Sequence, residues 1–481
     1  MAGTVRLEKL GIPVALAVAK GFEHDADSAC HVHGMPTLRQ VVIPGYVWGR
    51  QPREAKKPLA ISAFDDLVEA LIRPVTRDEM KPVQKKEVLK PVEIAAESYE
   101  AVLEKCNQVF LDSRWGDGLP MIPPTAERVK WMLLGTSRSA DEVIGKVAPG
   151  NGIATIEKIA INAVMAGAKP EYLPVIIAAM EGLTDEDYDL LHMQASVGNF
   201  TLAIIVNGPI AKEINMNSGH GFLGYGWRAN STIGRAVRLC LLNVGHVWPG
   251  VNDMANIGRP SPHIFFTYAE NEELCPWPPY HVGQGFKQED SCVTVSTVGG
   301  YVGSSVSSFT GRTVQELLNG IIKSLSPYRR IFALFKRGTH NPLAHPSKHV
   351  ITLHPQAAME LHQLGFSREG LGHYIYERTS VPYEELDPDE IHGIQERIKG
   401  SIEGDLILSD TIPPDRMPVF QEALKPGGRV PVMISPKDIH IVVAGGAPGS
   451  TLWMSYIKAP YKWTSHQIKL IRGATLTKAG Q

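Results

Sequence analysis

Apolar strand-like runs alternate with helical stretches along most of this chain, and this alternation constrains the fold more than any other feature. Leu202–Val206 is a short continuous apolar run of the kind that forms a buried strand, and Ile439–Ala444 is similar. Ser231–Val244, between them, has the pattern of a helix stopped at Gly245. Because parallel strands are joined by helical crossovers, the pattern predicts a multi-domain α/β fold, with mostly parallel or mixed sheets and flanking helices.

The 481 residues are too many for one ordinary core, so several domains are expected. The first segment has an apolar strand at Gly11–Ala19, a helical stretch near Glu23–His33 and a second strand at Gln40–Pro44. This βαβ-like unit is too short to fold alone, so the rest of the chain or a partner must complete it. The predicted division is a truncated βαβ-like unit at 1–60, a charged Pro-containing linker at 61–97, a central α/β domain holding the active site at 98–337, and a C-terminal α/β domain at 338–481.

Several helix ends carry their own local signals. Gly167 is suited to stop one helix, and Pro170 is suited to open the next. Thr313 and Glu316 have the spacing of a capping box, and Ser367 is expected to cap a later helix. These signals predict helix boundaries in both the central and the C-terminal domain.

The composition excludes several classes of protein. The net charge is -2, whereas a general nucleic-acid binder would show a basic surplus, so no nucleic-acid partner is expected. No run of about 18 apolar residues occurs, so no membrane span is expected. The N-terminus lacks the features of a signal peptide, and a cytoplasmic location is predicted. The cysteines are odd in number and without CxxC, which argues against a disulfide scaffold.

A glycine-rich segment from Asn217 to Asn230 contains a literal GxGxxG. A dinucleotide site needs a strand immediately before this motif and a helix opening at it, but the strand ends at Asn207 and the helix opens after Asn230, so NAD(P) is not expected. We interpret the segment as a loop for an anionic or polar substrate, next to a helix N-terminus. A structural turn is the alternative. The predicted substrate-binding residues are Asn217, Gly219, Gly221, Arg228, Asn230 and Ser231.

An acidic segment from Glu270 to Cys275 follows a strand-like run. The carboxylates of Glu270, Glu272 and Glu273 are candidates for a general base or for metal ligands. Cys275 is a candidate nucleophile or redox thiol. The alternative is a solvated acidic loop. Together with the glycine-rich segment, these residues make the stretch from Asn207 to Pro279 the predicted functional centre.

Asp117 and His220 complete the predicted catalytic residues. Asp117 lies between two glycines on a Pro-rich turn, which is also the pattern of a turn leading into a helix capped by Thr125. His220 is one of several central histidines that are candidates for acid–base chemistry, although a structural histidine is the alternative for each. The other central histidines are His192, His246, His263 and His281.

Two further patterns carry weaker hypotheses. His24, Cys30, His31 and His33 are close in sequence, but their spacing matches no standard zinc pattern. The glycine-rich turn at 445–449 follows a strand, and it fits either a phosphate-type loop or an ordinary strand-to-helix turn.

Six segments spread along the chain resemble one known family. They are Leu7–Pro13, Trp115–Pro120, Glu157–Gly167, Val206–Pro209, Arg228–Ala236 and Glu270–Glu273. The sequence resembles the UGSC-type (seleno)proteins, a family named for a Sec/Cys-Gly-Ser-Cys motif. That motif is expected just N-terminal of Leu7–Pro13, but it does not occur in this sequence. Either a separate small subunit carries it, as the truncated first unit favours, or this relative has lost thiol chemistry and uses only the central pocket.

The resemblance and the motifs together predict the large subunit of a soluble enzyme, an oxidoreductase or lyase. It would act on a small anionic substrate by redox chemistry or C–S/C–X bond cleavage, with a thiol or selenol from a small Cys- or Sec-containing partner subunit. An oligomer is therefore expected. Two alternatives remain open, namely a metal-dependent hydro-lyase or hydrolase that uses central carboxylates and histidines, and a non-catalytic scaffold subunit. No cofactor is identified, and the presence of a metal ion stays open.

Overall fold

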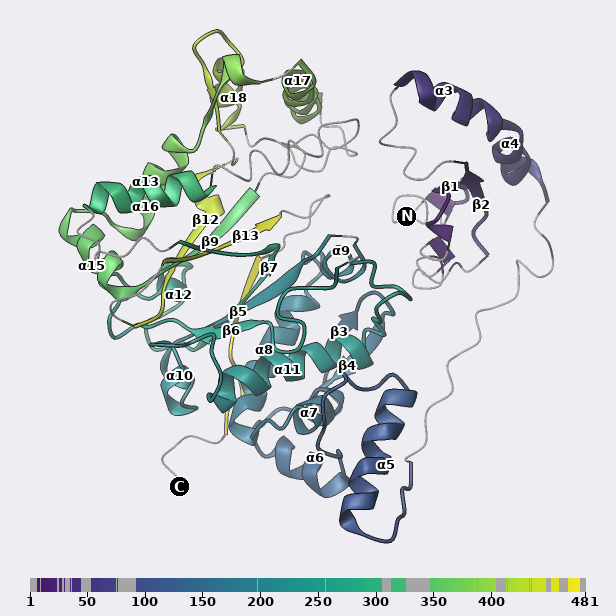
Figure 1. The fold of residues 1–481 in the computed structure, drawn as a ribbon, viewed down its shortest axis with the longest axis vertical. Helices are drawn as coiled ribbons and strands as arrows, with labels where there is room; N and C mark the ends of the chain where they lie inside the picture. The colour runs from purple at the N-terminus through teal and green to yellow at the C-terminus, as the bar shows by residue number, and fades with distance from the viewer. Residues whose placement is uncertain are drawn as a thin grey trace.

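The computed structural model places most of the chain in helices and strands (Figure 1). It describes residues 7–8, 10–23, 26–27, 30, 35, 37–44, 53–74, 76, 92–196, 198–255, 257–304, 313–325, 347–386, 388–403, 412, 414–431, 433, 435–446, 451–457 and 466–475.

The N-terminal unit has two short strands, β1 (Leu16–Ala19) and β2 (Gln40–Ile43), which pair in parallel. The helix predicted near Glu23–His33 lies largely outside the described residues. Two further helices follow, α3 (Arg53–Ser62) and α4 (Phe64–Ile72). The apolar side chains of β2, α3 and α4 form a small separate cluster. The predicted linker of residues 61–97 therefore starts within the end of α3 and contains α4, and its residues 77–91 lie outside the described part.

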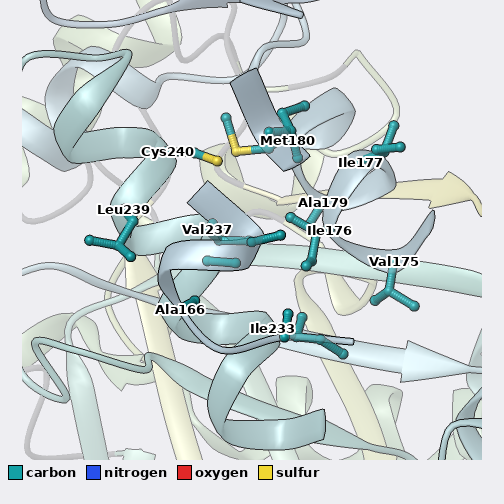
Figure 2. Close-up of a cluster of buried hydrophobic side chains, with 14 of the residues drawn as sticks. Ala166, Val175, Ile176, Ile177, Ala179, Met180, Ile233, Val237, Leu239 and Cys240 are labelled. Carbon is teal, nitrogen blue, oxygen red and sulfur yellow. The ribbon is translucent and has the colours of Figure 1, made fainter. Parts of the chain in front are cut away.

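The first large sheet has the strand order β14-β7-β5-β6. Its centre is β5 (Thr201–Asn207), in which every residue is buried, and β6 (Phe266–Ala269) runs parallel to it. The strands β7 (Cys292–Val298) and β14 (His466–Leu470) add two antiparallel pairs. The helices α8 (Leu173–Leu183) and α11 (Arg228–Asn243) lie along this sheet. Figure 2 shows how Ile176 and Met180 pack near Val237 in the core between these helices.

The second sheet has the order β12-β9-β13-β8. The parallel pair β9 (Ser347–Leu353) and β12 (Ile439–Val443) is extended by the antiparallel strands β13 (Thr451–Ile457) and β8 (Gly300–Ser304). The helices α13 (Val314–Leu325), α15 (Pro355–Gln363) and α16 (Arg368–Arg378) accompany it.

The two sheets pack face to face with helices outside both, as Figure 1 shows. The alternation of side chains along the strands reveals the layers, because neighbours in a strand point to opposite faces. In β5, Ala203 and Ile205 join a cluster with Val350 and Val442 of the second sheet, whereas Ile204 joins the core under α8 and α11. The predicted α/β class with mixed sheets and flanking helices is confirmed.

The sheets exchange strands. β8 precedes α13 in the chain but pairs in the second sheet, and β14 follows every strand of the second sheet but pairs with β7 of the first. Each sheet therefore takes strands from both sides of residue 337, where the sequence predicts a domain boundary. Whether the chain folds as separate units on the two sides of residue 337 stays a prediction.

The smaller elements connect these layers. The hairpin β3 (Val143–Val147) and β4 (Gly152–Thr155) precedes α7, and β10 pairs with β11. The remaining elements are α5 (Tyr99–Asp112), α6 (Ala126–Leu133), α7 (Ile156–Met165), α9 (Leu190–Ala195), α10 (Pro209–Glu213), α12 (Tyr280–Gly283), α17 (Pro388–Glu403), α18 (Met417–Ala423), β10 (Val381–Pro382), β11 (Arg429–Val430) and the 3₁₀ turns Pro170–Tyr172, Tyr383–Glu385 and Pro436–Asp438. None of the helices within the described ranges has the length and apolarity needed to span a membrane.

Most of the predicted helix ends are confirmed. Gly167 ends α7 with a left-handed φ of 78°, and Ser367 accepts a hydrogen bond at the start of α16. Thr313 and Glu316 exchange the bonds of a capping box. The prediction for α11 was wrong by three residues, because the helix starts at Arg228 rather than Ser231. Trp227 has extended backbone angles and serves as the N-cap of α11, so the helix starts directly after the glycine-rich loop.

Candidate functional site

The carboxyl ends of three strands meet at one edge of the sandwich. Asn207 ends β5, Glu270 follows β6, and Val443 ends β12. The backbone N–H of Asn271 donates to the carbonyl of Val443 over 2.7 Å, which ties the two sheets together there. In α/β folds the crevice at the carboxyl ends of parallel strands is where ligands bind. This edge is therefore the candidate site.

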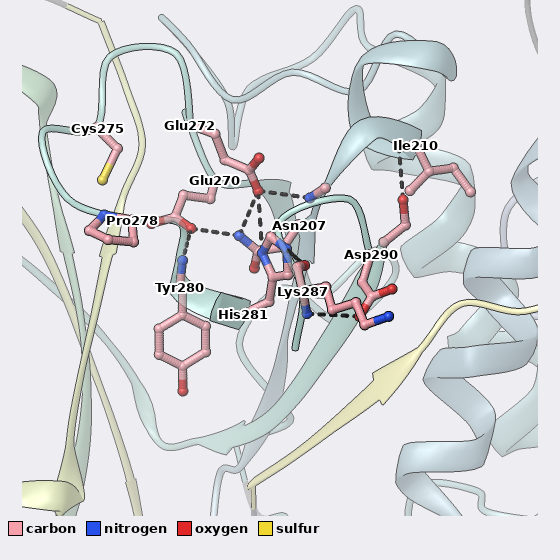
Figure 3. A network of polar contacts seen from close by, with 12 residues as sticks. Asn207, Ile210, Glu270, Glu272, Cys275, Pro278, Tyr280, His281, Lys287 and Asp290 are labelled. Atoms are coloured by element: carbon pink, nitrogen blue, oxygen red, sulfur yellow. Dashed lines mark hydrogen bonds and ion pairs between the residues drawn. The ribbon is translucent and has the colours of Figure 1, made fainter. Parts of the chain in front are cut away.

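Glu270 is the most deeply buried carboxylate of this edge, with a fully buried side chain. One carboxylate oxygen accepts hydrogen bonds from the Asn207 amide at 2.5 Å and the Tyr280 backbone N–H at 2.6 Å (Figure 3). The other accepts from Arg368 at 3.0 Å and from the Val443 N–H at 3.3 Å. Both oxygens are occupied, one by Asn207 of the first sheet and the other by Val443 of the second, so Glu270 joins the sheets and has no oxygen left for substrate.

Glu272 presents a different arrangement, with one oxygen anchored and the other open. Its Oε1 accepts from the Asn207 amide at 3.0 Å and from the Gly208 N–H at 2.7 Å (Figure 3). Its Oε2 makes no hydrogen bond within the described part of the chain, and the side chain is 24% exposed. A carboxylate that is fixed at one oxygen and accessible at the other has the geometry of a general base.

His281 stands behind Glu272 and is completely buried. Its Nε2 lies 3.0 Å from the Lys287 carbonyl, and since a carbonyl can only accept, Nε2 carries a proton. Its Nδ1 lies 3.7 Å from Glu272 Oε1 and has no hydrogen-bond partner among the described residues. A buried nitrogen left in this way costs free energy, which a role in the folded protein would explain. Glu272 and His281 are therefore two neighbouring titratable groups at this edge.

The next carboxylate and the thiol lie in different surroundings. Glu273 forms an ion pair with Lys212 at 2.5 Å, and both side chains are largely exposed, as in the solvated-loop alternative. The sulfur of Cys275 lies 3.2 Å from Arg368. Burial, aided by the charge of Glu270, raises the pKa of the Cys275 thiol to about 11, although Arg368 opposes this. Cys275 is therefore a thiol rather than a thiolate at neutral pH.

The predicted loop residues Asn217 and Asn230 hold the loop itself. Asn230 is buried, accepts from the Asn217 N–H, and donates to the carbonyls of Asn217, Phe222 and Thr267. Asn217 accepts from the Gly219 N–H and donates to the His220 carbonyl. Gly221 has a left-handed φ of 69°, which a glycine adopts without strain. These bonds match the structural-turn alternative for this segment.

Arg228 and Ser231 are engaged elsewhere. The Arg228 guanidinium donates twice to the carbonyl of Gly167, at 3.0 and 2.9 Å, and so satisfies the end of α7. Because α11 starts at Arg228, the Ser231 N–H already donates to the Trp227 carbonyl at 3.1 Å. These donors therefore bind backbone carbonyls of the protein, whereas the sequence predicted that they bind an anion.

His220 lies where two glycine-rich segments meet. The Gly445 N–H donates to the Ser218 carbonyl at 2.8 Å. A Cβ added at Gly446 would lie 2.8 Å from the Cβ of His220, so only glycine fits there without a shift. The loop of residues 217–226 and the turn after β12 thus lie together at the candidate site. Residues 447–450 of that turn fall outside the described residues.

Asp117, which is distant in sequence from the other predicted site residues, forms a buried salt bridge. Arg235 donates to both of its oxygens, at 2.8 and 2.9 Å. Burial alone would raise the pKa of Asp117, but the hydrogen bonds and charge of Arg235 outweigh it and hold the pKa below its usual value. Asp117 therefore anchors α11 to the turn before α6, as the structural alternative for this turn requires.

Three residues at the edge are not among the site residues predicted from the sequence, namely Asn207, Arg368 and Tyr280, although Asn207 begins the predicted functional centre. Asn207 was detectable as a polar residue at the end of an apolar strand. Arg368 lies almost a hundred positions from Glu270, and no local pattern connects the two.

The metal hypothesis at His24, His31 and His33 falls outside the described residues. Within the described ranges, no three His, Cys, Asp or Glu side chains are grouped to hold a metal ion.

Comparison with known protein families gives a match to the N-terminal part of the chain. The UGSC family matches residues 1–73, which include Leu7–Pro13 and the β1–β2 unit. The other segments of the resemblance, from Trp115 onward, lie beyond the matched residues. No curated protein matches the sequence. The N-terminal unit of this chain is therefore similar to the UGSC family.

Proposed function

We propose that this chain is the large subunit of an enzyme that carries out acid–base chemistry on a small molecule at the carboxyl-end edge. Glu272 is the proposed base, anchored through Oε1 by Asn207 and Gly208, with Oε2 open. The observation that carries the proposal is the buried Nδ1 of His281, without a hydrogen-bond partner among the described residues and 3.7 Å from Glu272. A histidine in this position can stabilise the carboxylate or take up charge as a proton moves.

The proposed reaction is a C–S or C–X bond cleavage that begins with proton removal. Glu272 Oε2 takes a proton from a substrate carbon, the C–H electrons form a double bond, and the leaving group departs with the electrons of the broken bond. The sequence-based expectation of an anionic substrate rested on Arg228, whose guanidinium binds Gly167. We therefore propose a small polar substrate with an acidic C–H, and do not specify its charge.

A nucleophilic sulfur or selenium would have to come from a partner. Each of the five cysteines has a pKa raised above the usual value, with burial as the largest cause. A raised pKa leaves little thiolate, which is the reactive form. This supports the proposal that a small Cys- or Sec-containing subunit supplies the thiol or selenol in any redox step.

The second candidate is a non-catalytic scaffold subunit. The observation that favours it is the number of predicted site residues whose polar atoms are engaged in structural bonds, including Glu270, Asn230 and Asp117. A scaffold would hold a small catalytic partner without acid–base chemistry of its own.

Profiling of a small-molecule extract separates these two candidates. The purified chain is incubated with the extract, with and without dithiothreitol as a thiol source, and consumed compounds are followed by mass spectrometry. We expect compounds that the wild type consumes and Glu272→Gln does not, because the amide cannot accept the proton. The matched control, Glu273→Gln, changes an exposed carboxylate one residue away and should behave as the wild type. Equal consumption by wild type and Glu272→Gln would remove Glu272 as the base, and no consumption by any form would favour the scaffold.

The partner is tested separately by affinity purification of the tagged chain from its native cells. A small co-purifying chain with a Cys or Sec that reacts rapidly with iodoacetamide is the expected result. Turnover by the isolated chain that is indifferent to added thiol would contradict the need for such a subunit, while leaving the role of Glu272 intact.

A further inference from the structure

A chain of polar side chains crosses the layer between the two sheets. Ser296 of β7 lies 2.6 Å from Nδ1 of His466 on β14. Nε2 of the same His466 lies 3.0 Å from the Tyr280 hydroxyl, which in turn lies 2.8 Å from Nδ1 of His440 on β12. Ser296 and Tyr280 are buried. One hydroxyl group thus bridges two histidines from different sheets.

The two imidazoles are stacked on each other. Their centroids lie 4.0 Å apart with an interplanar angle of 15°, and the Tyr280 ring meets both edge-on. Two imidazolium ions at this separation would repel strongly, so the second protonation of the pair is much harder than the first. The stacked pair can therefore take up one proton far more easily than two.

The hydroxyl of Tyr280 has one proton to donate, although it touches a nitrogen on each side. When it donates to His466, Nδ1 of His440 must donate to it; when it donates to His440, Nε2 of His466 must donate to it. When the pair carries one extra proton, the two arrangements differ only in which histidine holds it. Burial raises the pKa of Tyr280 well above its usual value, although Arg368 opposes this and Glu270 and Tyr268 add to it. The phenol therefore stays neutral in both arrangements.

We propose that His440 and His466 share one proton through Tyr280, as an acid–base site separate from Glu272 and His281. In the exchange, the N–H bond at Nδ1 of His440 breaks and its proton goes to the Tyr280 oxygen. The O–H bond of Tyr280 breaks in concert, and its proton goes to Nε2 of His466. One positive charge moves across the layer between the sheets, and the reverse step restores the first arrangement. The backbone N–H of Tyr280 meanwhile holds Glu270, which places this site beside the anchor of the carboxyl-end edge.

Nitrogen-15 NMR of histidine-labelled full-length protein tests the sharing during an acid titration. In the wild type, we expect the ring signals of His440 and His466 to move together during the uptake of the first proton, each by part of the full change. In Tyr280→Phe, which keeps the ring and the backbone N–H, the first proton should move the signals of one histidine only. The control is Tyr268→Phe, which removes a buried hydroxyl bonded to Thr352 in the same layer and should keep the joint response.

Separate titration of the two histidines in the wild type, or a joint response that survives in Tyr280→Phe, would overturn the proposal. Should Tyr280→Phe fail to fold, His440→Gln gives the same decision. Without a partner to share with, His466 should then show the full change for a single proton, and a partial change would contradict the sharing.

Discussion

Three carboxylates within four residues, Glu270, Glu272 and Glu273, have three different environments. Their side chains are 0%, 24% and 74% exposed, respectively. Glu270 and Glu272 are two positions apart and both reach the Asn207 amide, whereas Glu273 points to solvent and Lys212. The same residue type thus serves as an anchor, a proposed base and a surface charge, and only its neighbours distinguish these roles.

Glu270→Gln should lower the free energy of unfolding by about 3–5 kcal/mol, because it removes the charge that balances Arg368 in a buried pair. The matched control, Glu273→Gln, breaks only an exposed pair and should cost less than about 1 kcal/mol. Urea unfolding followed by circular dichroism measures both. A loss for Glu270→Gln no larger than the control would mean that this carboxylate does not hold the sheets together.

The predicted catalytic residues show what local sequence can and cannot provide at this scale. The clustering of acidic residues at 270–273 was visible, because neighbours in sequence remain neighbours in space. Their engagement was not, because Arg368 and Val443 reach Glu270 from distant parts of the chain. For the same reason the sequence around Asp117 does not reveal that Arg235 donates to both of its oxygens.

At the scale of elements, α11 depends on one glycine for its fit against the chain before β6. A Cβ at Gly234 would lie 1.8 Å from the carbonyl oxygen of Ile264 and 2.4 Å from the hydroxyl of Thr267. The close approach places α11 directly beside the segment that leads to the candidate site.

Gly234→Ala should therefore lower the free energy of unfolding by at least about 3 kcal/mol, since a backbone must move to admit the methyl group. Gly283→Ala is the matched control, because α12 leaves open space around that position. It should be neutral or stabilising by up to about 1 kcal/mol. Thermal unfolding of the two variants beside the wild type provides the comparison, and similar midpoints for both would contradict the close fit of α11.

Helix ends were the most predictable part of the fold. Gly167, Thr313 and Ser367 act within a few residues of their own positions, so their effect can be read locally. The start of α11 was predicted three residues late, because Ser231 is a good capping residue that the structure does not use as one. Trp227, a poor cap by composition, occupies that position because the preceding glycine-rich loop ends there.

At the scale of the whole molecule, the buried histidine of β9 makes stability depend on pH. His349 is 1% exposed, and burial lowers its pKa from 6.5 to about 3. Between these two values the unfolded chain binds a proton that the folded chain does not. The contribution of His349 to stability is therefore present above pH 6.5 and is lost as the pH falls.

Between about pH 7.5 and about pH 5, this residue alone should lower the free energy of unfolding by about 2 kcal/mol. His349→Gln should reduce that loss, because glutamine does not titrate. The comparison is made by urea unfolding at both pH values, with the exposed His373→Gln as control. An identical pH dependence in wild type and His349→Gln would show that His349 is not the group responsible.

The arrangement of the sheets was the least predictable property. The sequence patterns locate strands such as Thr201–Asn207 and Ile439–Val443 well, because a buried strand is continuously apolar. They do not state which strands pair, since pairing is decided by contacts between residues far apart. The return of His466–Leu470 to β7 is such a case.

That returning strand also bears on how the chain is made. β14 is translated after every other strand that the structure describes, yet it pairs with β7 in the first sheet. During synthesis, the outer edge of β7 is therefore exposed while the whole second sheet is still emerging. A nascent chain in this state presents unpaired backbone to its neighbours, and a chaperone that covers such an edge would be most needed in this interval.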